Sequence, residues 1–151
     1  MKKYFNLFII LTLIATSLTN CKKSDSSTAK MQARVNNSLT ICDSNVYVKK
    51  DLQNKLWGVS GNQKGGNNFN FTIPVLTVGT YQFLSFYSGT MCEAFYTKNY
   101  DFNNQYHSKN GSVTVTANTG KNIKGTFNFR ATNFRSTDSV EVTEGSFDID
   151  Y

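Results

Sequence analysis

Four carboxylates gathered near the C-terminus, Glu141, Glu144, Asp148 and Asp150, are the side chains best suited to acid-base chemistry. Two such groups facing each other across a cleft can carry out glycoside hydrolysis. Along this segment, however, most of them alternate with apolar residues, and alternate side chains of a strand point to opposite faces. We therefore expect the apolar set to be buried and the carboxylates to form a solvated outer face. This pattern predicts a domain that is not an enzyme.

The sole histidine, His107, lies in a polar stretch just before the Asn110-Gly111 pair, which is typical of a turn. We interpret it as a solvated loop residue, because catalytic triads and zinc sites need partners at spacings that this sequence lacks. Asp101 and Asn103 offer oxygen ligands for calcium, but the glycine and the distal glutamate of a calcium loop are missing. No metal and no cofactor are expected.

Aromatic residues are spread through an asparagine-rich stretch that runs from Phe95 to Tyr106. Exposed rings beside amide side chains can stack on sugars or contact a protein partner. Tyr96, Tyr100 and Tyr106 are therefore candidate ligand-contacting residues. The alternative is that the rings pack in the core, in an edge strand or within a well-packed loop.

Cys42 and Cys92 have two alternative roles. A disulfide between them would close a loop of about 50 residues, which in the chain-entropy model stabilises the fold by roughly 4 kcal/mol. Alternatively, each is a small buried apolar group on a β-strand. The sequence leaves both alternatives open.

A third cysteine, Cys21, follows a segment that has the features of a secretory leader. Two lysines follow Met1, and the chain continues into an apolar stretch from Tyr4 to Leu18 that is short for a membrane span. Leu18-Thr19-Asn20-Cys21 resembles the lipobox of bacterial lipoproteins, although Asn20 stands where Gly, Ala or Ser is usual. The resemblance implies cleavage before Cys21 and acylation of its thiol. Cleavage at a nearby site and an uncleaved anchor are the alternatives.

These signals divide the chain into three parts. Residues 1–20 are expected to be a lipoprotein signal peptide, residues 21–30 the lipidated cysteine and a flexible leash, and residues 31–151 a single domain. Lys22 stands where some enterobacterial lipoproteins carry the aspartate that retains them in the inner membrane, which favours the outer membrane. The formal net charge is +6, but the basic residues are scattered, so no nucleic-acid partner is expected.

The remaining chain has the two-residue alternation of β-strands. Apolar residues alternate from Val113 to Ala117 and again from Ile123 to Ala131, with a polar turn at 118–122, which predicts an antiparallel hairpin. The next strand changes parity before Phe147, which predicts a β-bulge at Gly145. The segment from Tyr81 to Tyr87 is apolar on both faces and is expected to be a central buried strand.

About eight to ten strands joined by short polar turns predict an all-β fold. We expect an antiparallel β-sandwich, with a closed or partly open β-barrel as the alternative.

Several of these strands together resemble a family of small Bacteroidota lipoproteins known only as a domain of unknown function. The resemblance lies in five segments: 111–116, 123–131, 140–147, 31–36 and 78–81. It implies a lipid-anchored protein of the cell envelope with an all-β domain, and no established activity. The expected function is non-enzymatic binding of an envelope partner or a structural role, with membrane attachment through the N-terminal lipid. The alternative is a small-ligand or glycan-binding module that uses the aromatic and asparagine-rich surface.

Overall fold

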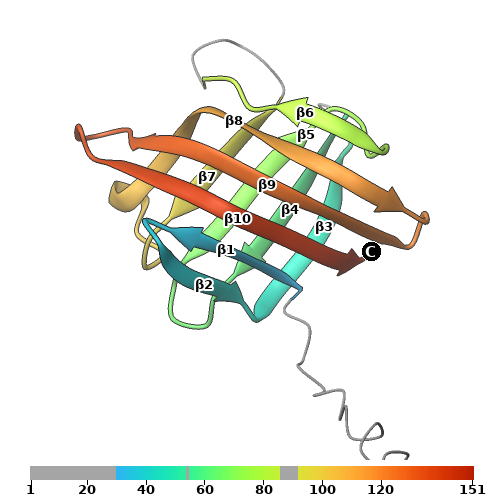
Figure 1. The fold of residues 1–151 in the computed structure, drawn as a ribbon, viewed down its shortest axis with the longest axis horizontal. Helices are drawn as coiled ribbons and strands as arrows, with labels where there is room; N and C mark the ends of the chain where they lie inside the picture. The colour runs from blue at the N-terminus through green and yellow to red at the C-terminus, as the bar shows by residue number, and fades with distance from the viewer. Residues whose placement is uncertain (1–29, 54, 86–91) are drawn as a thin grey trace, which may run out of the picture.

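A computed structural model describes residues 30–53, 55–85 and 92–151. Within these ranges the chain forms ten β-strands and one 3-10 helix, η2 (Figure 1). The strands are β1 (Met31–Val35), β2 (Ser38–Cys42), β3 (Ser44–Asp51), β4 (Leu56–Asn62), β5 (Asn68–Ile73), β6 (Gly79–Gln82), β7 (Glu93–Thr97), β8 (Gln105–Asn118), β9 (Asn122–Asn133) and β10 (Ser139–Asp150), and η2 spans Phe102–Asn104. The predicted leader and Cys21 lie outside the described residues. The described part of the chain contains no helix long and apolar enough to cross a membrane.

All ten strands belong to one antiparallel sheet, whose order is β2-β1-β10-β9-β8-β7-β5-β4-β3, with β6 attached to β8. The sheet curls until its two ends, β2 and β3, meet at the single connecting residue Asp43 (Figure 1). The result is a nearly closed barrel with an unsealed seam between its terminal strands. The all-β fold is thus confirmed, and the architecture is the partly open barrel that we gave as the alternative, not the sandwich.

The predicted hairpin near the C-terminus is present as β8 and β9, and β10 continues the meander. The register of β9 and β10 shifts between Val142 and Gly145, where Glu144 has a positive φ of 50°. A Cβ atom on Gly145 would lie only 2.4 Å from the carbonyl oxygen of Phe127. The bulge therefore needs a glycine at this position, and it returns Phe147 to the inner face, as the change of parity predicts.

Phenylalanine rings fill the interior of the barrel. Phe71 lies 5.3 Å from Phe127 and 5.6 Å from Phe147, measured between ring centroids, while Phe83 meets Phe129 edge-on at 5.9 Å. Each of these rings is at most 4 % exposed. An eight-to-ten-stranded barrel of this width is filled by its own side chains, so candidate sites are to be sought on its outer face and at its ends.

Aromatic packing bridges part of the seam. Trp57 on β4 meets the ring of Tyr151, just after β10, at 5.9 Å in an edge-on arrangement. The ammonium of Lys50 lies 5.6 Å from the centre of the Trp57 ring, within the range of a cation–π interaction. Side chains therefore join β4 and the end of β10 across the seam, where the two strands share no ladder of hydrogen bonds.

The prediction of a central buried strand at 81–87 is wrong for the residues that the structure describes there, which end at residue 85. β6 ends at Gln82 and pairs only with β8, so it is an attached edge strand. Phe83 is buried, but Leu84 is 45 % exposed, so the apolar run is covered on one side only. Phe86 and Tyr87 lie outside the described residues.

Candidate functional site

The outer face of β3, β4, β5 and β7 carries a row of side chains set by the strand register. Tyr47 pairs with Ser60, Ser60 with Asn70, and Asn70 with Phe95. The inward residues between them, such as Val59 and Phe71, belong to the core, so all four members of the row point outward. With strands about 4.8 Å apart, the row spans roughly 14 Å from Tyr47 to Phe95.

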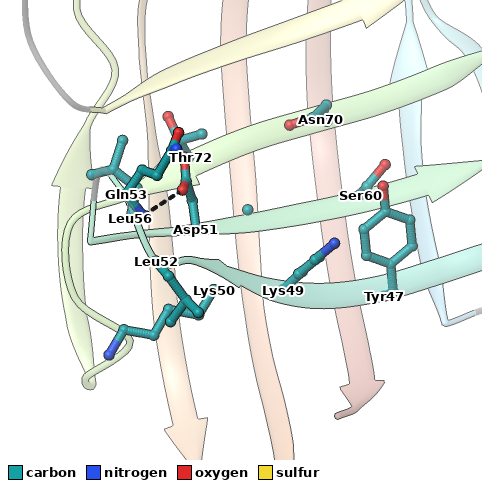
Figure 2. A pocket seen from close by; sticks show the side chains of 11 residues that line it. Tyr47, Lys49, Lys50, Asp51, Leu52, Gln53, Leu56, Ser60, Asn70 and Thr72 are labelled. Atoms are coloured by element: carbon teal, nitrogen blue, oxygen red, sulfur yellow. Dashed lines mark hydrogen bonds between the residues drawn. The ribbon is translucent and has the colours of Figure 1, made fainter.

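Small residues hollow the sheet over β3, β4 and β5. A cavity of about 520 Å³ opens there, and Gly58 and Ser60 supply little side-chain volume to fill it. Figure 2 shows Tyr47 and Lys49 reaching over it from β3, and Asn70 and Thr72 from β5. The tight turn after β3, where the Asp51 carboxylate accepts a hydrogen bond from the Gln53 amide at 2.9 Å, bounds one end.

A second hollow of about 360 Å³ adjoins the first on the side of β7 and β8. Asn70 lines both hollows, so they are neighbours on the outer face of the sheet. We call the two together the outer groove. Besides Asn70, the second hollow is lined by three amides, one hydroxyl and three aromatic rings: Asn62, Asn68, Gln105, Thr97, Phe95, Tyr100 and Phe102.

Hydrogen bonds on the sheet itself orient the amides of the outer groove. The Nδ2 atom of Asn68 donates to Ser60 Oγ at 3.2 Å and also to the side-chain oxygen of Asn62. These bonds tie β4 to β5 through side chains as well as through the backbone. The amide groups are thereby held in defined orientations before any ligand arrives, which lowers the entropic cost of binding.

Two exposed rings stand at the edge of the groove because a tight loop presents them. The amide of Tyr100 donates to the carbonyl of Gly66 at 2.6 Å, and its hydroxyl donates to the carbonyl of Gln63 at 3.2 Å. Gly66 has a φ of +115°, and a Cβ atom there would lie 2.7 Å from Asn99, so glycine permits this close approach. Tyr100 is consequently 54 % exposed on a fixed loop.

Phe102, the second of these rings, begins η2. Asp101 caps this helix, and its carboxylate accepts a hydrogen bond from the Asn103 amide at 2.9 Å. Asp101 also accepts hydrogen bonds from the side-chain amides of Asn103 and Asn104, each at 2.9 Å. The oxygen-rich cluster seen in the sequence therefore caps a helix, and it leaves the Phe102 ring 79 % exposed.

The outer groove combines flat aromatic surfaces with neutral hydrogen-bonding groups. Amides both donate and accept hydrogen bonds, and ring faces offer apolar contact. The charged groups lie toward the β3 end of the groove, at Lys49, Lys50 and Asp51. This arrangement suits a ligand that is polar, uncharged and partly flat.

Comparison with known proteins places the chain in a family. Residues 27–148 match a family described as Domain of unknown function (DUF6252). The chain belongs to this family. The expected resemblance to a domain of unknown function is thereby confirmed, and no curated protein and no solved structure matches the chain.

Among the three tyrosines proposed as ligand contacts, the DUF6252 domain presents only Tyr100 at the outer groove. Tyr96 and Tyr106 lie opposite each other on β7 and β8 and point inward, with 4 % and 7 % exposure. Phe102 belongs to the aromatic stretch recognised in the sequence but is not one of the three candidate tyrosines, and the three asparagines of β4 and β5 were missed. The alternation Asn68-Phe69-Asn70-Phe71 could have indicated the asparagines, because it puts amides on the face opposite the buried rings.

Both cysteines of the described part of the chain are free and buried. Of the two alternatives, the structure has the buried thiols and not the disulfide. Cys42 lies on β2, against Gly61, while Cys92 precedes β7, and four strands separate β2 from β7 in the sheet. Burial raises the pKa of the Cys42 thiol to about 12 and that of Cys92 to about 11. These thiols therefore behave as small core groups.

The C-terminal carboxylates lie on the outer face, as their alternation predicts. Asp148 accepts a hydrogen bond from the Asn122 amide at 2.8 Å and pairs with the Lys124 ammonium at 2.6 Å. These contacts hold the pKa of Asp148 below its usual value. Glu144 pairs with Arg34 at 2.9 Å, on the other side of the bulge.

His107 differs from the expected solvated loop residue. It lies within β8, half-buried, with Phe95 edge-on at 4.8 Å and Phe134 at 6.0 Å. Burial, with a contribution from the charge of Lys109, lowers the pKa of His107. Within the described ranges, no three His, Cys, Asp or Glu side chains gather in a way that could hold a metal ion.

Proposed function

We propose that this DUF6252 domain is a lipid-anchored, non-enzymatic binding protein of the cell envelope that holds a neutral glycan in the outer groove. The observation that supports it is the lining of the groove, in which the amides of Asn62, Asn68 and Asn70 lie beside the exposed rings of Tyr100 and Phe102.

A glycan fits the chemistry of this groove better than a charged ligand does. Sugar hydroxyls both donate and accept hydrogen bonds, as amides do, and the apolar face of a sugar ring packs on an aromatic ring. The floor of the groove between Asn70 and Phe102 carries no charged side chain among its lining residues. An extended oligosaccharide could continue across Asn70 into the neighbouring hollow over Gly58 and Ser60.

Binding without catalysis is in keeping with how the acidic residues are engaged. Asp148 and Glu144 each pair with a basic residue, and Asp150 accepts a hydrogen bond from Asn122 at 2.8 Å. These contacts lie along β10, whereas the outer groove lies over β3, β4, β5, β7 and β8. Among the described residues that line the groove, Asp51 is the one carboxylate, so a ligand there would meet no pair of them.

The anchor part of the proposal rests on the sequence around Cys21. An acylated cysteine followed by a polar leash of about ten residues would keep the barrel close to a membrane while leaving its outer face free to bind. Two or more acyl chains make such attachment stable, at about 0.8 kcal/mol for each buried methylene. Lys22, in place of the aspartate that retains some enterobacterial lipoproteins in the inner membrane, supports the outer membrane as the proposed location.

Glycan binding is tested by screening the protein expressed from the full chain against an array of neutral oligosaccharides, followed by calorimetry on any that bind. Replacing Tyr100 by Ala and Phe102 by Ala should each weaken the interaction by about fivefold, because stacked rings contribute on the order of 1 kcal/mol. Phe134→Ala is the matched control, because this ring is 63 % exposed but lines neither hollow. Equal losses in all three variants, or no neutral glycan bound, would contradict the proposal.

The anchor is tested by labelling cells with radioactive palmitate and comparing the wild type with Cys21→Ser. The label should appear in the wild type, be absent from the variant, and disappear when the lipoprotein signal peptidase is inhibited. Separation of inner and outer membranes then locates the labelled protein. A wild-type chain that takes up no label would refute the anchor and leave the glycan site untouched.

A further inference from the structure

A separate hollow lies at the end of the barrel that carries the β1–β2 and β9–β10 turns, on the left in Figure 1. Its volume is about 540 Å³, and residues from β1, β2, β7, β8 and β10 line it. Tyr96 and Tyr106, the two candidates that the outer groove does not use, belong to this lining. The hollow shares no lining residue with the outer groove.

Three hydroxyl groups, carried by largely buried residues, line this hollow. Thr40, Tyr96 and Tyr106 are 4 %, 4 % and 7 % exposed, and the two tyrosine rings lie 5.9 Å apart. Within residues 30–53, 55–85 and 92–151, the three hydroxyls take part in no hydrogen bond, and their oxygens are open to the hollow and not sealed in the core. They border one common space from three different strands, where each can donate or accept a hydrogen bond. That combination suits a polar ligand.

Two opposite charges complete the lining. Lys98 follows β7 and Asp138 precedes β10, and both line the hollow. Neither forms an ion pair within the described part of the chain, so their charges remain available to a ligand. Val35 and Val140 add an apolar patch to the same lining.

We infer that this hollow binds a free α-amino acid with an apolar side chain. The ammonium group of such a ligand would be attracted by the Asp138 carboxylate, and its carboxylate by the Lys98 ammonium. The hydroxyls of Thr40, Tyr96 and Tyr106 can donate hydrogen bonds to the carboxylate or accept them from the ammonium.

The ligand's side chain would then pack against Val35 and Val140. One cation and one anion within one hollow match a zwitterion better than a neutral sugar or a simple ion, since each charge of the ligand finds its opposite. This is a second site, independent of the glycan proposed for the outer groove.

Calorimetry on the protein expressed from the full chain tests the inference with L-leucine, L-valine and L-phenylalanine as probes. N-acetyl-L-leucine amide serves as the matched probe that lacks both charges, and D-glucose as the neutral polyol. We expect saturable binding of at least one amino acid, with no saturation by the amide or by glucose. Failure of all three amino acids to bind with a dissociation constant below about 1 mM would overturn the inference. Equal binding of the uncharged amide would also overturn it.

Variants assign the binding to this hollow. Asp138→Asn and Lys98→Met change exposed residues, so folding is preserved, and each should weaken amino-acid binding by about tenfold through the loss of one charge partner. Tyr106→Phe keeps the ring and removes only the hydroxyl, and should cause a loss of similar size. Tyr100→Phe, in the outer groove, is the control and should leave amino-acid binding unchanged. Binding that all four variants retain in full would place the ligand elsewhere and refute the site.

Discussion

The two sides of the barrel differ in strand length and in what their outer faces carry. β8, β9 and β10 contain 14, 12 and 12 residues and form a continuous meander, whereas β4, β5 and β7 contain 7, 6 and 5. The long strands contribute Phe127, Phe129 and Phe147 to the interior. The short strands also contribute core rings, but their outer face is hollowed and lined with amides.

This difference suggests a division of labour within one sheet. Long hairpins make many local backbone hydrogen bonds and bury a regular apolar face, so they can act as a scaffold. The shorter strands need loops between them, and those loops place Tyr100 and Phe102 beside the groove. Binding residues commonly lie on loops that a rigid scaffold positions.

Among the variants that compare the two sides, we expect Phe127→Ala to lower the free energy of unfolding the most. This ring is 2 % exposed and contacts Phe69, Phe71 and Phe147, so its removal leaves a cavity at the centre of the barrel. The free energy of unfolding should fall by about 3–5 kcal/mol, measured by urea denaturation. Phe102→Ala, on the groove side, should change it by less than about 0.5 kcal/mol. Equal losses of unfolding free energy in the two variants would show that both sides contribute equally to stability.

Thiol reactivity tests whether the short-strand side is as well sealed as the scaffold. Burial raises the pKa of Cys42, so at pH 8 its reactive thiolate should be roughly a thousandfold scarcer than that of an ordinary thiol. Alkylation followed by mass spectrometry should therefore label neither Cys42 nor Cys92 in the folded protein. In urea two thiols should react if Cys21 is acylated, and three if it is not. Rapid labelling of Cys92 in the native protein would indicate that β7 opens readily.

Substitution of one glycine on each side tests how tightly that side is packed. A Cβ atom on Gly125, in β9, would lie 2.2 Å from the carbonyl oxygen of Thr114 and 2.3 Å from the Phe147 ring. Gly125→Ala should therefore lower the free energy of unfolding by about 1–3 kcal/mol. A Cβ atom on Gly58 would meet only the carbonyl oxygen of Lys49, at an ordinary 3.7 Å.

Gly58→Ala should consequently leave the free energy of unfolding within about 0.5 kcal/mol of the wild type. It should nevertheless weaken glycan binding, because the added methyl group occupies the floor of the outer groove. Thermal denaturation and calorimetry on the two variants measure both effects. A Gly58→Ala variant that unfolds as easily as Gly125→Ala would contradict the division between scaffold and site.

The smallest effect concerns pH. Hydrogen bonds from Lys124 and Asn122 lower the pKa of Asp148 in the folded state, so its contribution to stability is complete above the unfolded pKa, about 3.9. This contribution is lost as the pH falls through the lower folded-state pKa. Lys124→Met should remove most of it, so the stability difference between variant and wild type should shrink on acidification. Urea denaturation across this pH range, with NMR titration of the Asp148 carboxyl, measures it. A difference that stays constant with pH would refute the assignment.

The scaffold side could be predicted from the sequence because each of its signals is local. Alternation fixes the inward face of β9, and a change of parity before Phe147 requires the extra residue at the bulge. Both follow from the two-residue period of a strand and need no knowledge of distant contacts. Barrel closure is not local, because it depends on which strands become neighbours of β2 and β3.

The site side could be predicted only in part. Tyr96, Tyr100 and Tyr106 look alike in the sequence, yet only Tyr100 escapes the strand alternation that turns the other two inward. Its exposure depends on a loop that pairs with Gly66, more than 30 residues away along the chain. The prediction of a central strand near Tyr81 was wrong for a different reason. An apolar segment can also face the core from an edge strand, and β6 is attached to the sheet through β8 alone.

Asp43 alone separates the two strands that end the sheet, and its carboxylate accepts a hydrogen bond from the Lys64 amide at 2.7 Å. Because successive residues of a strand alternate between faces, adding or deleting one residue here would reverse which side chains of β3 point inward relative to those of β2. Val46 and Val48 would then turn to solvent while Tyr47 and Lys49 turned toward the rings inside. The length of this corner therefore decides which face of β3 packs against the core when the two ends of the sheet meet.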